Sequence, residues 1–409
     1  MPEPGLGKTG SVKICGICGV ISIVLFFPSL QARNLRDPRF MTRAEAGFDE
    51  IFNMDYDQAE RNFAALEKDY PQHPAPPLYR ASIQWLKEMQ RRQDLSLNRF
   101  LTATYFSSKT NEVMPPQERT EFFDEIQQSE ALSRAILQKD RRDKDGRYFL
   151  ATAYGLRASF AITIDHHLRE AFNYGNKAYS YARQLTEEDP QYYDAYLTLG
   201  IYEYTVGSIP WYMRWMIYIV GARGSKQEGL DHIKLASEKG QYVKDQAKLV
   251  SMVLDAREHR YADGLALASN LSTRFPRSCL FPINLAQLLQ LDGRKEESIS
   301  LFLEIEKRIE KREPNFDKLP LPSYRFNLGT ELLYMGKLDL AREHFKRSID
   351  DPETPEREKA LSHLHLGQIL SWQGQTAEAA KECKVVLSLK DVDGSHDEAR
   401  KLLNKINKR

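Results

Sequence analysis

The stretch YRFNLGTELLYMGKLDLAREHFKRSIDDP, residues 324–352, decides the fold. Gly329 is followed 12 residues later by Ala341, then by Phe345, and Pro352 closes the stretch. Small residues at the first two positions let the backbones of two antiparallel helices approach, and an aromatic ring one helical turn further on fills the space beside them. Proline ends the unit because it cannot continue a helix. The stretch therefore predicts a helical hairpin.

Four other segments repeat this spacing. They lead with Gly47, Met252, Ala286 and Gly367, and 12 residues later each has a small residue, at Ala59, Gly264, Ser298 and Ala379. Self-similarity of this kind is typical of an array in which each hairpin packs on its neighbours. We predict regular repeats at about residues 40–73, 245–278, 279–312, 322–355 and 360–393.

Residues 74–240 keep the template but stretch it. The paired small residues Ala153 and Ala178 are 25 positions apart, which predicts two helices lengthened by about two turns each. Gly200 and Gly229 are 29 apart, and the excess lies in an aromatic insertion at 209–222. Further helices are expected near 77–92, 95–106 and 117–139.

The predicted fold class is therefore all-α. We expect one α-solenoid of helical hairpins over residues 33–409, with irregular or extended hairpins over 74–240. A single polar-faced helix over 395–409 is expected to cap it, because a stack must cover its last apolar face.

The five regular segments resemble the tetratricopeptide repeat (TPR), which implies a scaffold fold. Residues 196–240 also resemble the core of the Iml2 and tetratricopeptide repeat protein 39 family, with matches at Ser208, Pro210, Gly221, Gly224, Gly229 and Leu230. Lys226 and Gln227 depart from that pattern, which has an acidic–basic pair there. The resemblance implies that the apolar insertion belongs to the repeat fold.

The N-terminus is typical of an export signal. Lys8 and Lys13 precede an apolar run of 14 residues, 14–27, which is short for a spanning helix. Pro28 ends the run, and Ala32 offers a cleavage site. We predict that residues 1–32 are a signal peptide, with an uncleaved membrane anchor as the alternative. The protein would then be exported, to the periplasm or another extracytoplasmic location, which suggests a bacterial relative.

Charge and motif content exclude several functions. The chain has 58 basic and 57 acidic side chains and no basic block, which argues against nucleic acid as a partner. The adjacent His166 and His167 point in different directions on a helix, and the pair Glu228 and His232 lacks a third ligand. We find no catalytic motif and expect no metal, no cofactor and no enzyme activity.

The candidate site is a ladder of uncharged polar residues. In a helical array the first helix of each hairpin lines a concave groove, and two groove positions lie two before and one after the small residue. These positions hold Asn284 and Gln287, Asn327 and Thr330, and His365 and Gln368 in three successive repeats. Asn and Gln both donate and accept hydrogen bonds, which suits an extended peptide. We predict a protein or peptide partner, against the alternative of a merely solvated helix face.

The aromatic insertion is a second candidate contact surface. Trp211, Tyr212 and Trp215 stand within 209–222. The segment is too short, and with Arg214 too charged, to span a membrane. Its apolar residues recur at helical spacing, which favours packing against the array. The alternatives are contact with a partner, or a membrane-peripheral protein that touches lipid through this insertion.

Overall fold

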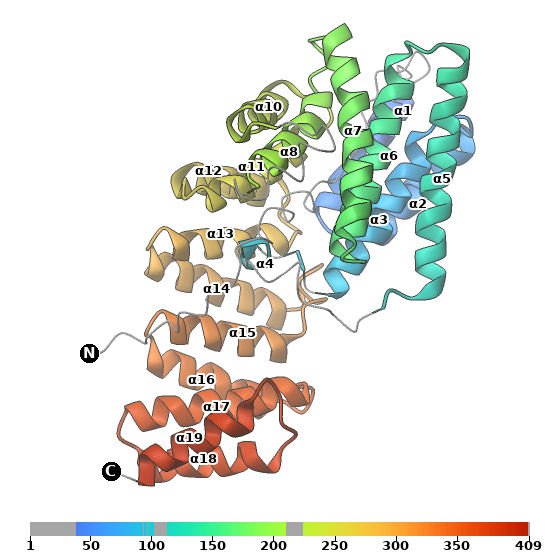
Figure 1. Cartoon of the computed structure of the whole chain (residues 1–409). Coiled ribbons are helices and arrows are strands. Elements are labelled where there is room, and N and C mark those ends of the chain that lie inside the picture. The colour runs from blue at the N-terminus through green and yellow to red at the C-terminus, as the bar shows by residue number, and fades with distance from the viewer. Residues whose placement is uncertain (1–37, 93, 96, 102–112, 210–223, 408–409) are drawn as a thin grey trace. The chain divides into compact units, whose positions relative to one another are not determined.

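The computed structural model describes residues 38–92, 94–95, 97–101, 113–209 and 224–407 (Figure 1). Every regular element in these ranges is a helix, which confirms the predicted all-α class. The chain forms two compact units, with the division between Asp292 and Gly293, and we describe each by itself. Unit 1 ends at Asp292 and unit 2 begins at Gly293.

Unit 1 is built from helical hairpins, each packed on the next. The hairpins pair α1 with α2, α3 with α5, α6 with α7, α8 with α10, and α11 with α12, followed by α13. Their bounds are α1 Pro38–Phe52, α2 Tyr56–Asp69, α3 Ala75–Arg91, α4 Leu97–Leu101, α5 Pro116–Lys139, α6 Lys144–Thr163, α7 Leu168–Glu188, α8 Ala195–Gly207, α10 Lys226–Lys239, α11 Lys244–Arg257, α12 Tyr261–Arg274 and α13 Leu280–Leu291.

The paired small residues face each other across a hairpin, as the spacing predicts. A Cβ added to Gly200 of α8 would lie 2.6 Å from the carbonyl oxygen of Gly229 on α10. One added to Gly229 would lie 2.4 Å from the backbone nitrogen of Tyr204. Both neighbours are backbone atoms, which cannot move aside as a side chain can. Glycine is therefore required at both positions for the two helices to pack this closely.

The lengthened helices are α6 and α7. They have 20 and 21 residues, against 14 each for α11 and α12 of a regular repeat. The difference of six or seven residues is about two helical turns, as predicted. Ala178 of α7 packs against Leu150 and Tyr154 of α6.

The two ends of unit 1 contact each other. Phe52 at the end of α1 stacks on Phe275, which follows α12, with ring centroids 4.8 Å apart. The backbone N–H of Arg277 donates to Asn53 Oδ1 at 3.0 Å, and its Nε lies 2.9 Å from a carboxylate oxygen of Asp55. The first hairpin of unit 1 is thereby joined to residues more than two hundred positions further along the chain.

Unit 2 continues the hairpin pattern and ends in a cap. Its helices are α14 Lys295–Glu310, α15 Leu321–Tyr334, α16 Leu338–Ile349, α17 Glu356–Trp372, α18 Thr376–Ser388 and α19 Ser395–Asn407. Ala399 of α19 is buried with Leu364 of α17 and Cys383 and Val386 of α18. Helix α19 therefore covers the last apolar face, where the sequence predicts the cap.

Several predictions fall outside the described residues. They include the export signal over 1–32 and the contacts proposed for Trp211, Tyr212 and Trp215. Within the ranges given above, no helix has the length and apolar character needed to cross a bilayer. The single array over 33–409 also stays a prediction.

Candidate functional site

The six predicted groove residues divide between the two units. Asn284 and Gln287 lie on α13 of unit 1, Asn327 and Thr330 on α15 of unit 2, and His365 and Gln368 on α17 of unit 2. Each pair holds the same two positions of its repeat, so their surroundings can be compared directly.

Asn284 already holds a backbone amide of its own chain. The Asn284 side chain is 1% exposed, and its Oδ1 accepts a hydrogen bond of 3.0 Å from the N–H of Leu97, the first residue of α4. Gln287 is buried as well. The sequence predicts that these two residues line an exposed groove, whereas in the structure packing within unit 1 covers both of them. Their role toward a partner stays a prediction.

The surroundings of Asn284 are otherwise apolar. Leu97 and Phe100 of α4 lie against side chains from α3, α11 and α13, and a cavity of about 40 Å³ remains between them. Figure 1 draws α4 beside α13. The lining includes Trp85, Leu249 and Phe281.

The corresponding residues of unit 2 are more accessible. Asn327 is exposed, and Thr330 and Gln368 are half-buried. The Thr330 hydroxyl donates to the carbonyl of Phe326 at 3.0 Å, which is a bond within its own helix. Of the two positions on α15, Asn327 is therefore the one whose side chain faces solvent.

His365 is half-buried, and its ring contacts other side chains of unit 2. Its ring stacks on Phe345, with centroids 5.2 Å apart, and its Nδ1 lies 3.1 Å from Gln368 Oε1. Burial lowers the pKa of His365 below its ordinary value, although the bond to Gln368 opposes the shift. The imidazole is therefore neutral at neutral pH and offers hydrogen bonds without a charge.

Two exposed aromatic residues extend this face. Tyr334 at the end of α15 is 79% exposed, and Trp372 at the end of α17 is 58% exposed. They stand seven residues after Asn327 and His365, and residues seven apart lie on nearly the same face of a helix. The predicted groove positions do not include these two aromatic residues. The repeat spacing nevertheless relates them, because each stands five residues after the small residue of its repeat, Gly329 or Gly367. We call Asn327, Tyr334, His365, Gln368 and Trp372 the unit 2 face.

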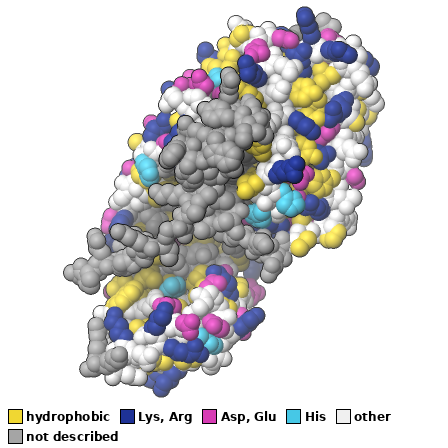
Figure 2. Space-filling model, in the orientation of Figure 1, with side chains coloured by type: hydrophobic (Ala, Val, Ile, Leu, Met, Phe, Trp, Pro, Cys, Tyr) yellow, Lys and Arg dark blue, Asp and Glu magenta, His cyan; other side chains and the backbone are white. Residues whose placement is uncertain are grey.

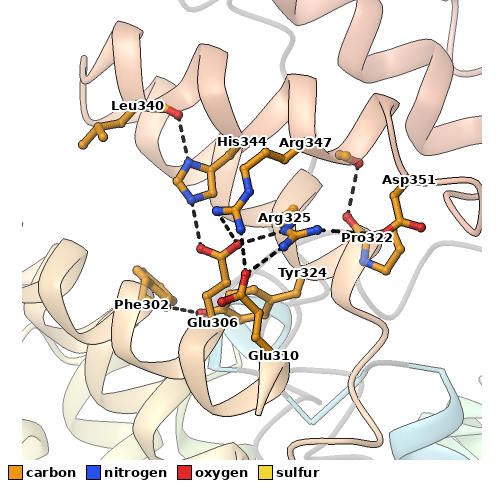
Figure 3. A network of polar contacts seen from close by, with 11 residues as sticks. Phe302, Glu306, Glu310, Pro322, Tyr324, Arg325, Leu340, His344, Arg347 and Asp351 are labelled. Atoms are coloured by element: carbon orange, nitrogen blue, oxygen red, sulfur yellow. Dashed lines mark hydrogen bonds and ion pairs between the residues drawn. The ribbon is translucent and has the colours of Figure 1, made fainter. Parts of the chain in front are cut away.

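A polar network fixes the helix that carries Asn327 (Figure 3). The buried carboxylate of Glu306 on α14 accepts from Arg325 Nε on α15 at 2.9 Å and from His344 Nε2 on α16 at 3.1 Å. Arg347 of α16 approaches the same carboxylate at 3.0 Å. Glu310 accepts from Arg325 at 2.8 Å and from Arg347 at 2.6 Å. These bonds join three consecutive helices, and we call the five residues the Glu306 network.

His344 is charged in this arrangement. Its Nδ1 lies 2.9 Å from the carbonyl oxygen of Leu340 and its Nε2 faces the Glu306 carboxylate, so both ring nitrogens must donate. Burial lowers the pKa of His344, but the bonds to Glu306 and to the Leu340 carbonyl and the charge of Glu306 together outweigh it, so the pKa is raised. Burial likewise raises the pKa of Glu306, and its bonds to His344 and Arg325 bring it down to about 2. The network is therefore ionic at neutral pH.

Figure 2 shows basic and acidic side chains interspersed over the described part of the face that it draws. Among the described residues, no group of three or more His, Cys, Asp or Glu side chains could hold a metal ion. His232, paired in the sequence with Glu228, instead contacts Glu203 at 2.6 Å.

Comparisons with known proteins agree with the repeat architecture. Residues 326–394, which include most of α15 and all of α16 to α18, match the family model of the tetratricopeptide repeat. A search of curated proteins finds no match to the chain. Nothing in these comparisons supports the resemblance of residues 196–240 to the Iml2 family, which stays a prediction.

Two solved structures illustrate the similarity. The human IFIT1 dimer with m7Gppp-AAAA has 12% identity and a TM-score of 0.40, over 96% of this chain and 86% of that chain. A tetratricopeptide repeat protein from Parabacteroides merdae has 15% identity and a TM-score of 0.28, over 90% of this chain and 98% of that chain.

Proposed function

We propose that this protein is a non-catalytic scaffold that binds an extended segment of a partner protein on the unit 2 face. The observation that carries the proposal is the hydrogen bond from Leu97 N–H to Asn284 Oδ1. It is an example, within this molecule, of the asparagine at this repeat position holding a peptide backbone. Asn327 occupies the same position of its own repeat and is exposed.

The two exposed aromatics support the same surface. Tyr and Trp offer large contact areas with little rotamer freedom to lose, and they are enriched at protein interfaces. Tyr334 and Trp372 hold the same position in successive repeats, so one extended segment could contact both. Their exposure leaves apolar area that a partner would remove from water.

The chemistry of the face favours an internal segment of the partner over a chain terminus. None of the five residues is Lys or Arg, so the face has no cation of its own to pair with a terminal carboxylate. The neutral His365 and the amides of Asn327 and Gln368 suit hydrogen bonds to main-chain groups. We expect apolar side chains of the partner to lie against Tyr334 and Trp372.

We further propose that the protein is exported, on the strength of the N-terminal sequence. The basic residues, the apolar run at 14–27 and Ala32 support a signal peptide. Sequencing of the N-terminus of protein purified from its host distinguishes cleavage after Ala32 from an intact anchor. A mature N-terminus in the cytosolic fraction would contradict export.

The binding proposal is tested by site-specific crosslinking in the native host. A photoreactive amino acid replaces Tyr334 in one strain and the exposed Lys384 of α18 in a control strain. We expect a partner to be captured at position 334 and absent from the Lys384 sample. The affinity of the purified partner should then fall at least tenfold on Tyr334→Ala/Trp372→Ala, and stay unchanged on Val385→Ala, another exposed apolar residue. Equal affinities of all three proteins would overturn the proposal.

A further inference from the structure

An apolar groove in unit 1 is occupied by a segment of the same chain. Its walls come from α1, α2, α3, α11 and α13, and they include Phe52, Tyr56, Trp85, Val253 and Phe281. The occupant is α4 together with Leu95, which follows α3 in the sequence. We call the apolar walls that these helices supply the unit 1 groove.

The segment is bound in the manner of a peptide ligand. The Leu97 side chain is fully buried and that of Phe100 almost so. Asn284 supplies one main-chain hydrogen bond, from a position 187 residues away in the sequence. Helix α4 has only five residues, and isolated helices of this length are not stable in water. Its conformation therefore depends on the groove.

The fit between segment and groove is incomplete. A cavity of about 40 Å³ remains among the apolar lining residues. Protein interiors are close-packed, with few voids larger than a water molecule. The described residues therefore leave room beside Leu97 and Phe100 for a slightly bulkier side chain.

We infer that Leu95 and α4 form an intramolecular ligand, and that the unit 1 groove binds an external peptide of similar pattern when this segment is displaced. The external peptide carries an apolar side chain followed three residues later by an aromatic one, as Leu97 and Phe100 do. In the resting protein the tethered segment excludes it. The inference uses the same Leu97–Asn284 hydrogen bond as the proposed function, but it concerns another surface, because the unit 2 face lies in the other unit. Peptide binding to the unit 1 groove can therefore fail while partner binding at Tyr334 and Trp372 is kept, and the reverse.

The test uses the full chain and a synthetic peptide. The variant Leu97→Asp/Phe100→Asp expels the segment, because two carboxylates are costly to bury in an apolar groove. The probe is a fluorescein-labelled peptide, DLSLNRFL, with the sequence of residues 94–101. We expect the variant to bind it at least tenfold more tightly than the natural sequence does, since the competing segment is removed. A peptide with Ser at the Leu97 and Phe100 positions should not bind to either protein.

Two further measurements show whether the peptide binds in the unit 1 groove and test the inference in the natural protein, where misfolding of a variant plays no part. Adding Asn284→Ala to the variant should weaken peptide binding, because the main-chain hydrogen bond is lost. In the natural protein, amide hydrogen exchange should show Leu97 opening at least tenfold more often than the amides of α11. A folded variant that does not bind the peptide would overturn the inference. So would a Leu97 amide that exchanges only in step with α11.

Discussion

Helices α13 and α15 use one repeat position in two ways. Asn284 on α13 is buried and bonded to Leu97, whereas Asn327 on α15 is exposed and stands seven residues before Tyr334, which lies largely in solvent. The residue type is the same and the offset from the small residue is the same. What differs is whether another part of the chain covers the position. The repeat thus determines what a side chain can bind, and distant segments determine whether it is free to do so.

Each unit also contains a buried glutamate, and the two differ in their hydrogen-bond partners and in their pKa. Glu306 of unit 2 has several donors and a pKa of about 2. Glu125 on α5 of unit 1 is paired with Arg80 at 3.0 Å, and its Oε2 has no hydrogen-bond partner among the described residues. Burial raises the pKa of Glu125 to about 8, and the opposing effect of Arg80 is smaller. One carboxylate joins helices by its charge, and the other is mostly protonated at neutral pH.

The largest effect is expected when the Glu306 network is broken. Glu306→Ala removes the shared acceptor, leaves the buried His344 without its carboxylate partner, and leaves Arg325 with Glu310 alone at close distance. Loss of one partner from such a pair costs about 3–5 kcal/mol. Urea unfolding followed by hydrogen exchange should show unit 2 destabilised while α11 and α13 keep their protection. Glu304→Ala, at an exposed site on the same helix, is the control and should change little. Equal stability of both variants would contradict the structural role of the network.

The next effect bears directly on the two asparagines. Asn284→Ala leaves the buried Leu97 N–H without its acceptor, and an unsatisfied buried donor costs about 1–3 kcal/mol. Asn327→Ala removes an exposed side chain and should change stability by less than about 0.5 kcal/mol. Urea titrations of the two variants measure the difference. Equal effects would mean that the contrast between the two faces has no energetic consequence.

The hairpins could be predicted because their cause is local in sequence. Gly200 and Gly229 face each other since two antiparallel helices bring positions of this type together, and α6 and α7 are long because their small residues are further apart. The cap at α19 follows from the polar face of its sequence and the need to cover the last hairpin.

The candidate site could be predicted only in part. The burial of Asn284 depends on Leu97, which no spacing rule connects to it. The Glu306 network depends on side chains of three helices meeting at one carboxylate. The position of Tyr334 on the same helix face could be predicted from the sequence, since it lies seven residues after Asn327. Its exposure to solvent could not, because that depends on which other segments cover the helix.

Glu306 and Glu125 are expected to change the stability of their units in opposite directions as the pH changes. The folded pKa of Glu306 is about 2, below its ordinary 4.5, so its stabilising contribution is present above pH 4.5 and lost as pH falls toward 2. His344 has a raised pKa, so its contribution is present below pH 6.5 and lost as pH rises through the raised value. Unit 2 should therefore be most stable between about pH 4.5 and 6.5.

Glu125 makes unit 1 lose stability over a different range. Its folded pKa is about 8 and its ordinary value is 4.5, so the folded state holds a proton that the unfolded state releases. Stability should fall as pH rises from 4.5 to 8. Glu125→Gln keeps the shape and removes the titration, so the variant should gain stability relative to the natural protein at pH 8 and not at pH 4. Thermal unfolding at the two pH values measures this, and a constant difference between the proteins would contradict the assignment.

The smallest effect on stability is expected at the residues with the largest expected effect on binding. Tyr334→Ala and Trp372→Ala remove side chains that lie mostly in solvent, so each should change the free energy of unfolding by less than about 0.5 kcal/mol. Phe345→Ala, in the same unit but fully buried, should cost about 3–5 kcal/mol. Denaturation of the three variants gives the comparison. If Tyr334→Ala were as destabilising as Phe345→Ala, the Tyr334 side chain would be part of the core. The unit 2 face would then not offer it to a partner.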